Sequence, residues 1–290
     1  MQNIDWNEKI NKIRSWLNKH KRLVLPCGIL ALVIITLALW RPQKTTTRLP
    51  DSGVEVITRA TQLVKEVNFQ AEYDEQFSRK VNGVAEDHSY KLRESKKGTS
   101  WKKETFIDDL TLLEAFIRND QSYFHCTTYP EISCVESAIT SNDGSRSSRD
   151  ASLSGFSLWE QKKIFQASVS QQNITVDSES RSATCVSYAF NPGSVSDEDV
   201  AALMNAIGGP AASSAGSASA LREWLKQYDV DVCYDDLTGI MLGYHSVIRQ
   251  SVSLENGGRM EYESEDTQTI TRLRLNPLFS SDEFSTSSVR

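Results

Sequence analysis

The sequence predicts an α+β protein in which a single N-terminal transmembrane helix precedes a curled antiparallel sheet. Three observations lead to this class. One long apolar stretch without charges lies near the N-terminus, short segments of alternating apolar and polar residues recur through the rest of the chain, and turn signals separate them. Because hairpins join the segments, we expect an antiparallel half-barrel of about ten or eleven strands, interrupted by inserted helices.

The apolar stretch is Leu23–Trp40, eighteen residues without a charge. A helix of that length measures roughly 27 Å, close to the ~30 Å hydrocarbon thickness of a bilayer. Residues 1–22 carry six basic side chains, whereas the ten residues after the span carry three. Since excess Lys and Arg marks the cytoplasmic side, we expect a basic cytoplasmic tail at 1–22, a membrane span at 23–40, a linker at 41–50 and an extracytoplasmic domain at 51–279.

A cleaved signal peptide is the competing interpretation of the span. No small-residue cleavage site follows Trp40, and the apolar run is longer than the core of a usual signal peptide. We therefore expect an uncleaved signal anchor in the cell membrane. Apolar residues at helical spacing in the tail fit either an amphipathic helix on the membrane surface or a solvated helix.

Charge and cysteine content are consistent with an extracytoplasmic domain. Beyond residue 40 the chain carries 26 basic and 36 acidic side chains, which argues against nucleic acid as a partner. The four cysteines in this part predict two disulfides with three possible pairings. Proximity in the sequence favours Cys126 with Cys134, which leaves Cys185 with Cys233. Metal binding is disfavoured because C-x2-C spacing is missing. Asn173 begins a glycosylation sequon, relevant only in a glycosylating host.

The first elements of the domain are a helix and a series of hairpins. Ser52 and Glu55 form a capping box, and the apolar residues from Val56 to Val67 follow at helical spacing. From Asn68 the apolar period changes to two, which indicates a strand. The strands expected next are 89–94, 101–107, 112–118, 122–127 and 132–138.

The second half alternates between helical and strand patterns. We expect a loop at 141–155, a helix at 156–169, a helical insertion at 192–228 and a flexible tail at 280–290. The strands expected here are 174–176, 183–190, 230–234, 240–248, 251–254, 260–263 and 269–275.

The sequence shows no catalytic motif. The four histidines lie far apart, and the paired acids Asp108–Asp109 and Asp235–Asp236 fall at turns, where Asp is favoured for backbone hydrogen bonds. There is no nucleophile elbow, calcium loop or glycine-rich phosphate loop. We therefore expect neither an enzyme nor a cofactor or metal site.

Several segments resemble LolA-like extracytoplasmic proteins. They are EAFIRNDQSYFHC at Glu114–Cys126 with the following Cys134, ATCVSYAF at Ala183–Phe190, DVCYDDLTGIMLGYHSV at Asp231–Val247, and the ending that includes TRLRLNPLFSSDEF at Thr271–Phe284. The resemblance spans roughly residues 52–286. It implies a half-open antiparallel barrel whose apolar concave face is plugged or lidded by helices, in a family that carries or senses lipids and lipoproteins.

Two functions follow as expectations. A tethered domain cannot shuttle between membranes, so the first is a membrane-anchored, non-enzymatic interaction module of the cell envelope with an envelope protein as partner. The alternative is binding or sensing of lipid or lipoprotein acyl chains in an apolar concave pocket. Each candidate lining residue can equally be packed core. The candidates are Trp101, Phe106, Phe116, Phe124, Trp159, Phe165, Tyr188, Met204, Trp224 and Met241.

Overall fold

A computed structural model describes residues 50, 52–119, 122–138, 160, 163–199, 218–253 and 258–289. All of them belong to one compact unit, Leu49–Arg290, which is distinct from a unit at Met1–Arg48. Within these residues no helix has both the length and the apolarity needed to cross a membrane. The expected tail and span at residues 1–40 lie outside the described residues.

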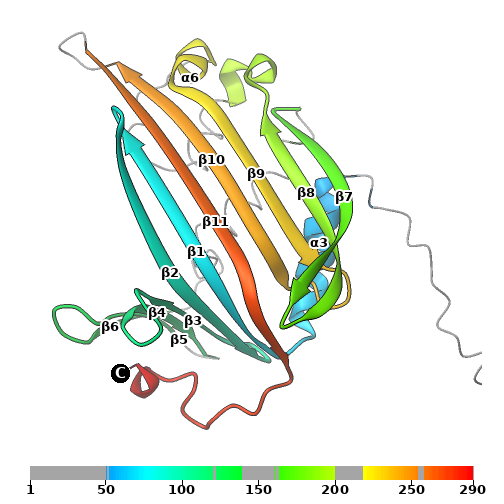
Figure 1. Ribbon diagram of the computed structural model, residues 1–290, viewed down its shortest axis with the longest axis vertical. Coiled ribbons are helices and arrows are strands. Elements are labelled where there is room, and N and C mark those ends of the chain that lie inside the picture. The colour runs from blue at the N-terminus through cyan, green and yellow to red at the C-terminus, as the bar shows by residue number, and fades with distance from the viewer. Residues whose placement is uncertain are drawn as a thin grey trace, which may run out of the picture. The chain divides into compact units, whose positions relative to one another are not determined.

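Eleven strands form one antiparallel sheet in the described part of the chain (Figure 1). Their order is β6-β5-β4-β3-β2-β1-β11-β10-β9-β8-β7, so the first and last strands are neighbours in the middle of the sheet. The strands are β1 (Phe69–Val81), β2 (Val84–Lys97), β3 (Ser100–Phe106), β4 (Leu112–Arg118), β5 (Ser122–Thr127), β6 (Ser133–Ala138), β7 (Phe165–Val176), β8 (Glu179–Phe190), β9 (Leu225–Asp235), β10 (Met241–Ser253) and β11 (Arg259–Leu275). The sheet and its hairpins agree with the fold class predicted from the alternating pattern.

The helix before the sheet is α3 (Gly53–Lys65). The Ser52 side chain accepts a hydrogen bond from the Glu55 backbone N–H at 3.2 Å, which confirms the predicted cap. Val56 and Ala60 are buried, and α3 packs mainly on β8. Shorter helices in the described part of the chain include η1 (Pro192–Ser194), α6 (Ala218–Trp224) and η3 (Thr286–Ser288).

Several predicted element boundaries are wrong. Residues 165–169, expected at the end of a helix, begin β7, because twelve residues from Phe165 pair with β8 without a shift in register. The helical insertion expected at 192–228 ends earlier, since β9 starts at Leu225. Residues 251–253 and 260–263, expected in short separate strands, belong to the long strands β10 and β11, whose polar middle residues hide the alternation.

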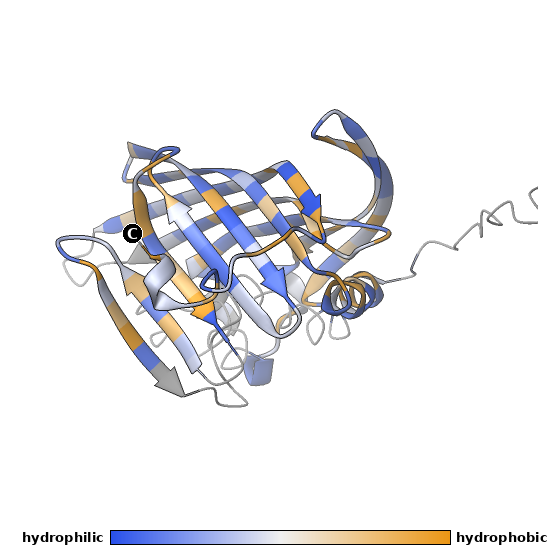
Figure 2. Cartoon of the chain, turned by 90° about the horizontal axis from the view of Figure 1, so that it is seen from below, coloured by the Kyte–Doolittle hydropathy of each residue, from blue (hydrophilic) through white to orange (hydrophobic). Residues whose placement is uncertain are grey.

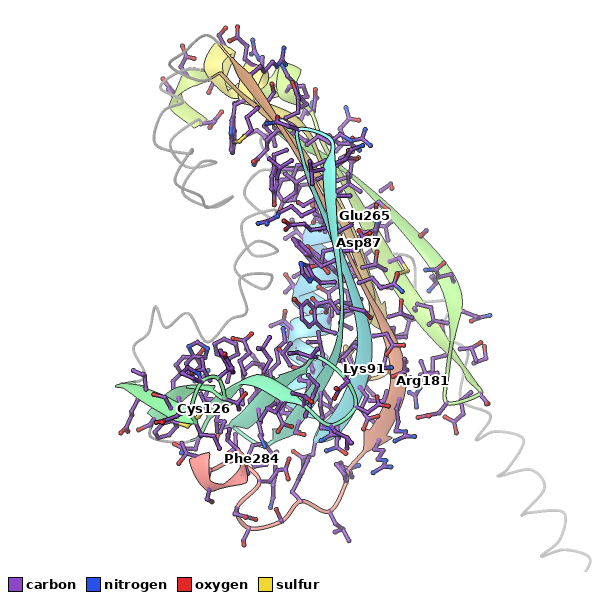
Figure 3. The ribbon with its side chains drawn as sticks, turned by 60° about the vertical axis from the view of Figure 1, so that its left-hand side comes forward. Asp87, Lys91, Cys126, Arg181, Glu265 and Phe284 are labelled. Carbon is purple, nitrogen blue, oxygen red and sulfur yellow. A yellow bond between two sulfur atoms is a disulfide. The ribbon has the colours of Figure 1, made fainter. Side chains whose placement is uncertain are left out.

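The two faces of the sheet differ in what covers them. Strand pairing places one set of residues on the same face as α3: Val186, Val232, Tyr244, Gln268, Glu75 and Tyr90. We call this the helix-side face, and the other the outer face. β3–β6 turn towards the side on which α3 lies, so the helix-side face is concave, whereas Asp87, Lys91, Arg181 and Glu265 point away from it (Figure 3).

Apolar residues collect in three clusters, and hydropathy alternates along many strands (Figure 2). The first cluster joins α3 to β7–β9 and includes Val56, Tyr188 and Val230. The second includes Phe69, Tyr73 and Ile270 at the central strands. The third lies on β4 and β5 and includes Leu112, Ala115, Ile117 and Cys126, together with Val289 from the C-terminal segment.

The C-terminal segment at 276–289 covers the outer face of β3–β5. Val289 is 4% exposed and contacts the third cluster, against which Phe284 also packs. The buried Lys102 ammonium lies 2.8 Å from the Glu104 carboxylate and donates a hydrogen bond of 2.9 Å to the Ser288 hydroxyl. This packing does not fit the flexible tail expected for residues 280–290.

Candidate functional site

Aromatic side chains form a stripe on the helix-side face of β1–β5. The pairings that place them there are Phe77 with His88, Glu75 with Tyr90, Lys96 with Trp101, Lys103 with Phe116, Phe116 with His125, and Arg118 with Tyr123. His88 is exposed and the other rings are partly exposed. We call this set the aromatic stripe: Phe77, His88, Tyr90, Trp101, Phe116, Tyr123 and His125.

Six of the seven rings of the aromatic stripe, all but Trp101, stack in two groups of three. The ring centroids of Phe116 and His125 are 4.4 Å apart with an angle of 4° between the planes, and Tyr123 stacks on Phe116 at 6.2 Å. His88 lies 6.4 Å from Phe77 and 6.0 Å from Tyr90 in similar geometry. Cross-strand aromatic pairs of this kind stabilise a sheet and present ring surface to whatever lies against it.

Polar partners hold several of these side chains in position. The Trp101 indole N–H donates to the Glu94 carboxylate at 2.6 Å, and the His125 Nε2 lies 3.1 Å from the Glu114 carboxylate. Lys96, beside Trp101, donates to the backbone carbonyls of Lys65, the last residue of α3, and of Val67, at 2.9 and 3.0 Å. Burial lowers the pKa of Lys96. The stripe is therefore a fixed apolar surface bordered by charge.

The structure divides the predicted lining residues among several surroundings. Trp101 and Phe116 belong to the aromatic stripe. Phe106 and Phe124 lie on the outer face with the third cluster, so they are on the wrong side for a concave pocket. Phe165, Tyr188 and Trp224 are buried in the first cluster, and Met241 is half-buried beside it. Trp159 and Met204 lie outside the described residues.

Sequence reasoning missed the rest of the stripe. Phe77, His88, Tyr90, Tyr123 and His125 come from four strands, and single-strand alternation assigns each only to one of two faces. The pairing register is what brings them together, because a shift of one residue would move a ring to the other face. Cross-strand matching of the hairpins is the signal that could have found them.

Two of the hollows in the described part differ in size and in lining. A cavity of about 20 Å³ lies between α3 and the β8–β9 region, with Val56, Ala60 and Tyr234 in its wall, and it has room for about one water. A hollow of about 370 Å³ at β1, β2 and β11 is lined mainly by polar residues, including Asp87, Glu265 and Thr267. The first is too small for an acyl chain. The second has Phe77 and His88 of the aromatic stripe in its wall beside the polar residues.

Both predicted disulfides are present. Cys126 is bonded to Cys134 and Cys185 to Cys233, which confirms the pairing favoured by proximity. Each bond joins directly opposite residues of adjacent strands, β5 with β6 and β8 with β9. The Gln172 amide N–H of β7 points at the second bond, 2.9 and 3.0 Å from its two sulfur atoms. The disulfides therefore brace both flanks of the sheet.

Glu160 connects α3 to the sheet. Its carboxylate accepts hydrogen bonds from the backbone N–H groups of Gly53 and Val54, at 3.2 and 3.0 Å, and from the Tyr188 hydroxyl at 3.1 Å. A carboxylate at a helix N-terminus is favourable because it satisfies free N–H groups and the helix dipole. Burial and the Glu160 charge raise the pKa of Tyr188 well above its usual value.

The remaining polar candidates have structural surroundings. The Asp235 carboxylate accepts hydrogen bonds from the backbone N–H and hydroxyl of Thr238, at 3.0 and 2.5 Å, as expected for a turn. His245 lies between Glu265 at 3.1 Å and Asp231 at 3.5 Å. A search of the described residues finds no group of three or more metal-ligating side chains. Asn173 is exposed on β7.

These features define a class: a disulfide-braced, curled antiparallel sheet with a helix on its concave face. No family model and no curated protein matches the chain. Solved structures similar to it include a LolA superfamily protein from Nitrosomonas europaea, with 9% identity over 83% of this chain and 100% of that chain and a TM-score of 0.32. A LolA-like protein is thus among the similar structures, as the resemblance implied.

Two further structures show the same level of similarity. A DUF1329 family protein from Desulfovibrio piger is 10% identical over 82% of this chain and 98% of that chain, with a TM-score of 0.30. Lipovitellin, in a structure of its lipid–protein interactions, is 10% identical over 74% of this chain and 26% of that chain, also with a TM-score of 0.30. Because these TM-scores are below 0.5, we transfer neither a site nor a function from these structures.

Proposed function

We propose that this chain is a membrane-anchored, non-enzymatic binding module that works outside the cytoplasm in the cell envelope. Its ligand is an apolar molecule, such as the acyl chain of a lipid or lipoprotein, and it binds on the aromatic stripe. The observation that carries the proposal is the stripe itself: seven exposed or partly exposed rings, six of them stacked, on the concave face of β1–β5.

Physical chemistry supports an apolar ligand at this surface. Ring faces that remain partly exposed gain roughly 25 cal/mol for each Å² of apolar surface that a ligand removes from water. Glu94 and Glu114 hold Trp101 and His125 in position, and the ring surface that stacking leaves exposed is the contact area. A flexible acyl chain can follow such a curved surface, because it has no polar groups that need partners there.

The expected tether supports a ligand drawn from the membrane. The linker at 41–50 has ten residues and reaches at most about 35 Å when fully extended. A domain held by the predicted span at 23–40 therefore stays near the bilayer, where acyl chains are concentrated. Binding there does not require the domain to diffuse between membranes.

A fluorescent fatty acid tests the proposal. The outer domain, residues 49–290, is titrated with the probe, and palmitate is then added to displace it. Tyr123→Ser is expected to weaken probe binding by about tenfold, since it removes a stacked ring. The matched control is Tyr129→Ser, because Tyr129 is 84% exposed and outside the stripe. If both variants bind the probe like the wild type, or if the wild type binds none, the stripe is not the site.

A protein partner is the second candidate function, and a different surface favours it. Ile107, Leu110, Tyr129 and Ile132 are each more than half exposed, on the two loops that flank the start of β4. Exposed large apolar residues gathered at one rim are typical of a contact surface. Leu110→Asp is expected to abolish site-specific crosslinking of the full chain to an envelope protein, whereas Leu237→Asp, at a distant exposed leucine, leaves it unchanged.

A further inference from the structure

Strand β7 is a free edge of the sheet as far as the described residues show. It is the last strand in the order, and all twelve of its residues pair with β8 on one side. Apart from the pairing with β8, no described backbone hydrogen bond involves residues 166–176, although β7 also contacts β11. The backbone groups on its second side are therefore available to pair with another strand.

Strand β7 also lacks the features that usually prevent an edge strand from pairing with another chain. Exposed edges are commonly short, bulged, or marked by Lys or Pro. β7 is twelve residues long, has no break in its register with β8, and contains no charged residue and no proline. Its exposed positions are Gln166, Ser168, Ser170, Gln171, Gln172, Asn173 and Thr175. By contrast, the opposite edge strand β6 has only six residues and includes Glu136.

We propose that β7 pairs antiparallel with β7 of a second copy of this chain, so that the two sheets continue into one another. This interface goes beyond the proposed function and is independent of the aromatic stripe. The absence of charge is the first argument for a second copy, because self-pairing brings no like charges together along the strand, although the chain as a whole is acidic.

Symmetry is the second argument. Antiparallel pairing of identical edges follows a two-fold axis and uses up both free edges, so the assembly closes as a dimer. Near the axis a residue in the middle of β7, such as Ser170 or Gln171, lies opposite its own copy. Serine, glutamine and asparagine side chains on both strands can then hydrogen-bond across the interface.

Cysteine scanning of the full chain in isolated membranes tests the pairing. A Cys27→Ser background removes the one cysteine that is in neither disulfide. Single cysteines are introduced into it by Ser168→Cys, Ser170→Cys, Gln171→Cys, Asn173→Cys and Thr175→Cys, and mild oxidation is followed by a non-reducing gel. We expect covalent dimers whose yield peaks at one position near the middle and falls towards both ends. Thr269→Cys, exposed on the central strand β11, is the control and is expected to give no dimer. Equal yields at Thr269 and on β7, or no dimer at any position, would overturn the proposal.

Charged substitutions at Gln171 then test whether the strand that pairs with β7 comes from a second copy of the chain. Gln171→Lys places two ammonium groups close together at the two-fold axis and is expected to lower the dimer fraction about tenfold, and Gln171→Glu does the same. Mixing differently tagged Lys and Glu copies is expected to restore pairing, because opposite charges then meet. A dimer that Gln171→Lys leaves unchanged would mean that another surface is used. Crosslinking of the β7 cysteines to a different protein in place of a second copy would also contradict the proposal.

Discussion

Gly239 shows how a single residue sets the distance between α3 and the sheet. Its φ is +70°, and an added Cβ would lie 2.2 Å from the Ala60 carbonyl oxygen of α3. Two separate requirements therefore exclude a side chain there: the left-handed backbone and the close contact. The Asp235–Thr238 hydrogen bonds hold the turn in this position.

Gly239→Ala is expected to destabilise the domain by about 2–4 kcal/mol, because strain in the backbone adds to the displacement of α3. Urea unfolding followed by tryptophan fluorescence measures the change. Gly83→Ala is the matched control. Gly83 has a φ of +87° but no atom within 4 Å of the added Cβ, so only the backbone penalty of roughly 1–2 kcal/mol is expected. Equal losses in the two variants would contradict the described contact with α3.

The Tyr188 hydroxyl predicts a loss of stability at high pH. Burial, followed by the Glu160 carboxylate, raises the pKa of Tyr188 in the folded state above its unfolded value near 10. Below pH 10 this tyrosine is protonated in both states and its contribution is complete. As pH rises above 10, the unfolded state loses the proton first, so the folded state becomes relatively less stable.

Urea midpoints between pH 8 and pH 11 check this sign. The wild type is expected to lose more stability over that range than Tyr188→Phe, in which the titrating group is missing. Tyr188→Phe is also expected to be less stable at pH 8, because the hydrogen bond to Glu160 is lost. Parallel pH profiles for the two proteins would show that Tyr188 does not carry the effect.

Sequence reasoning at this scale succeeds where partners are near one another in the chain. The Ser52 cap and the Cys126–Cys134 bond are local and were predicted. The hydrogen bonds of Glu160 with the start of α3 and of Ser288 with Lys102 were not predicted, because each joins residues more than one hundred positions apart in the chain. Their partners are set by packing, which no local pattern contains.

At the scale of elements, the two disulfides differ in the length of chain they close. Cys126–Cys134 closes a separation of eight residues, and Cys185–Cys233 closes 48. A crosslink stabilises mainly by restricting the unfolded chain, and it does so more for a longer loop. The segment between Cys185 on β8 and Cys233 on β9 includes η1 and α6. The second bond therefore also fixes the position of β9 beside β8 after this segment.

Replacing each cysteine pair by alanine tests that difference. The Cys126→Ala/Cys134→Ala variant is expected to lose about 2.5 kcal/mol and the Cys185→Ala/Cys233→Ala variant about 4 kcal/mol, from loop entropy alone. Urea unfolding of the two variants beside the wild type provides both values. A larger loss for the short loop would show that native packing, and not chain entropy, dominates.

Hairpins were predictable because turn residues and alternation agree there. β4 and β5 have the predicted bounds. The start of β7 was missed because Phe165 follows apolar residues at helical spacing, and the preference for a helix is overruled by pairing with β8. The length of β11 was missed because its polar middle, from Glu263 to Thr269, faces other polar strands and gives no alternation.

At the scale of the whole domain, the C-terminal segment is part of the core. It covers Ala115, Ile117 and Cys126, none of which is exposed at all. The buried Lys102–Glu104 pair lies beneath it as well, and such a pair offsets part of the apolar gain because both charges lose water. The segment therefore adds a moderate net stabilisation.

Removing residues 279–290 is expected to destabilise the domain by about 2–4 kcal/mol, since the contacts of Val289 and Phe284 are lost while the ion pair regains water. Urea unfolding provides the value. Ser287→Ala, at an exposed position of the same segment, is the control and is expected to change stability by less than about 0.5 kcal/mol. An unchanged midpoint after truncation would mean that the segment does not hold the outer face.

The sequence predicts the architecture of the domain more fully than its candidate site. Strand number, antiparallel pairing and the first helix follow from local patterns. The curl, the assignment of faces and the aromatic stripe depend on the register between hairpins, and the stripe combines rings from Phe77 to His125 that no single segment contains. Half of the predicted lining residues are buried in the core or lie on the outer face. Without the register, these residues could not be told apart from those on the concave face.

The pairing of β1 with β11 has a consequence for biosynthesis. The two strands join over thirteen residue pairs, although about 190 positions of chain separate them. Because a polypeptide is made from its amino end, the β11 side of β1 stays unpaired until nearly the whole chain has been synthesised. Maturation is therefore expected to be slow and concerted, and a helper that shields the waiting strand would raise the yield of correctly assembled product.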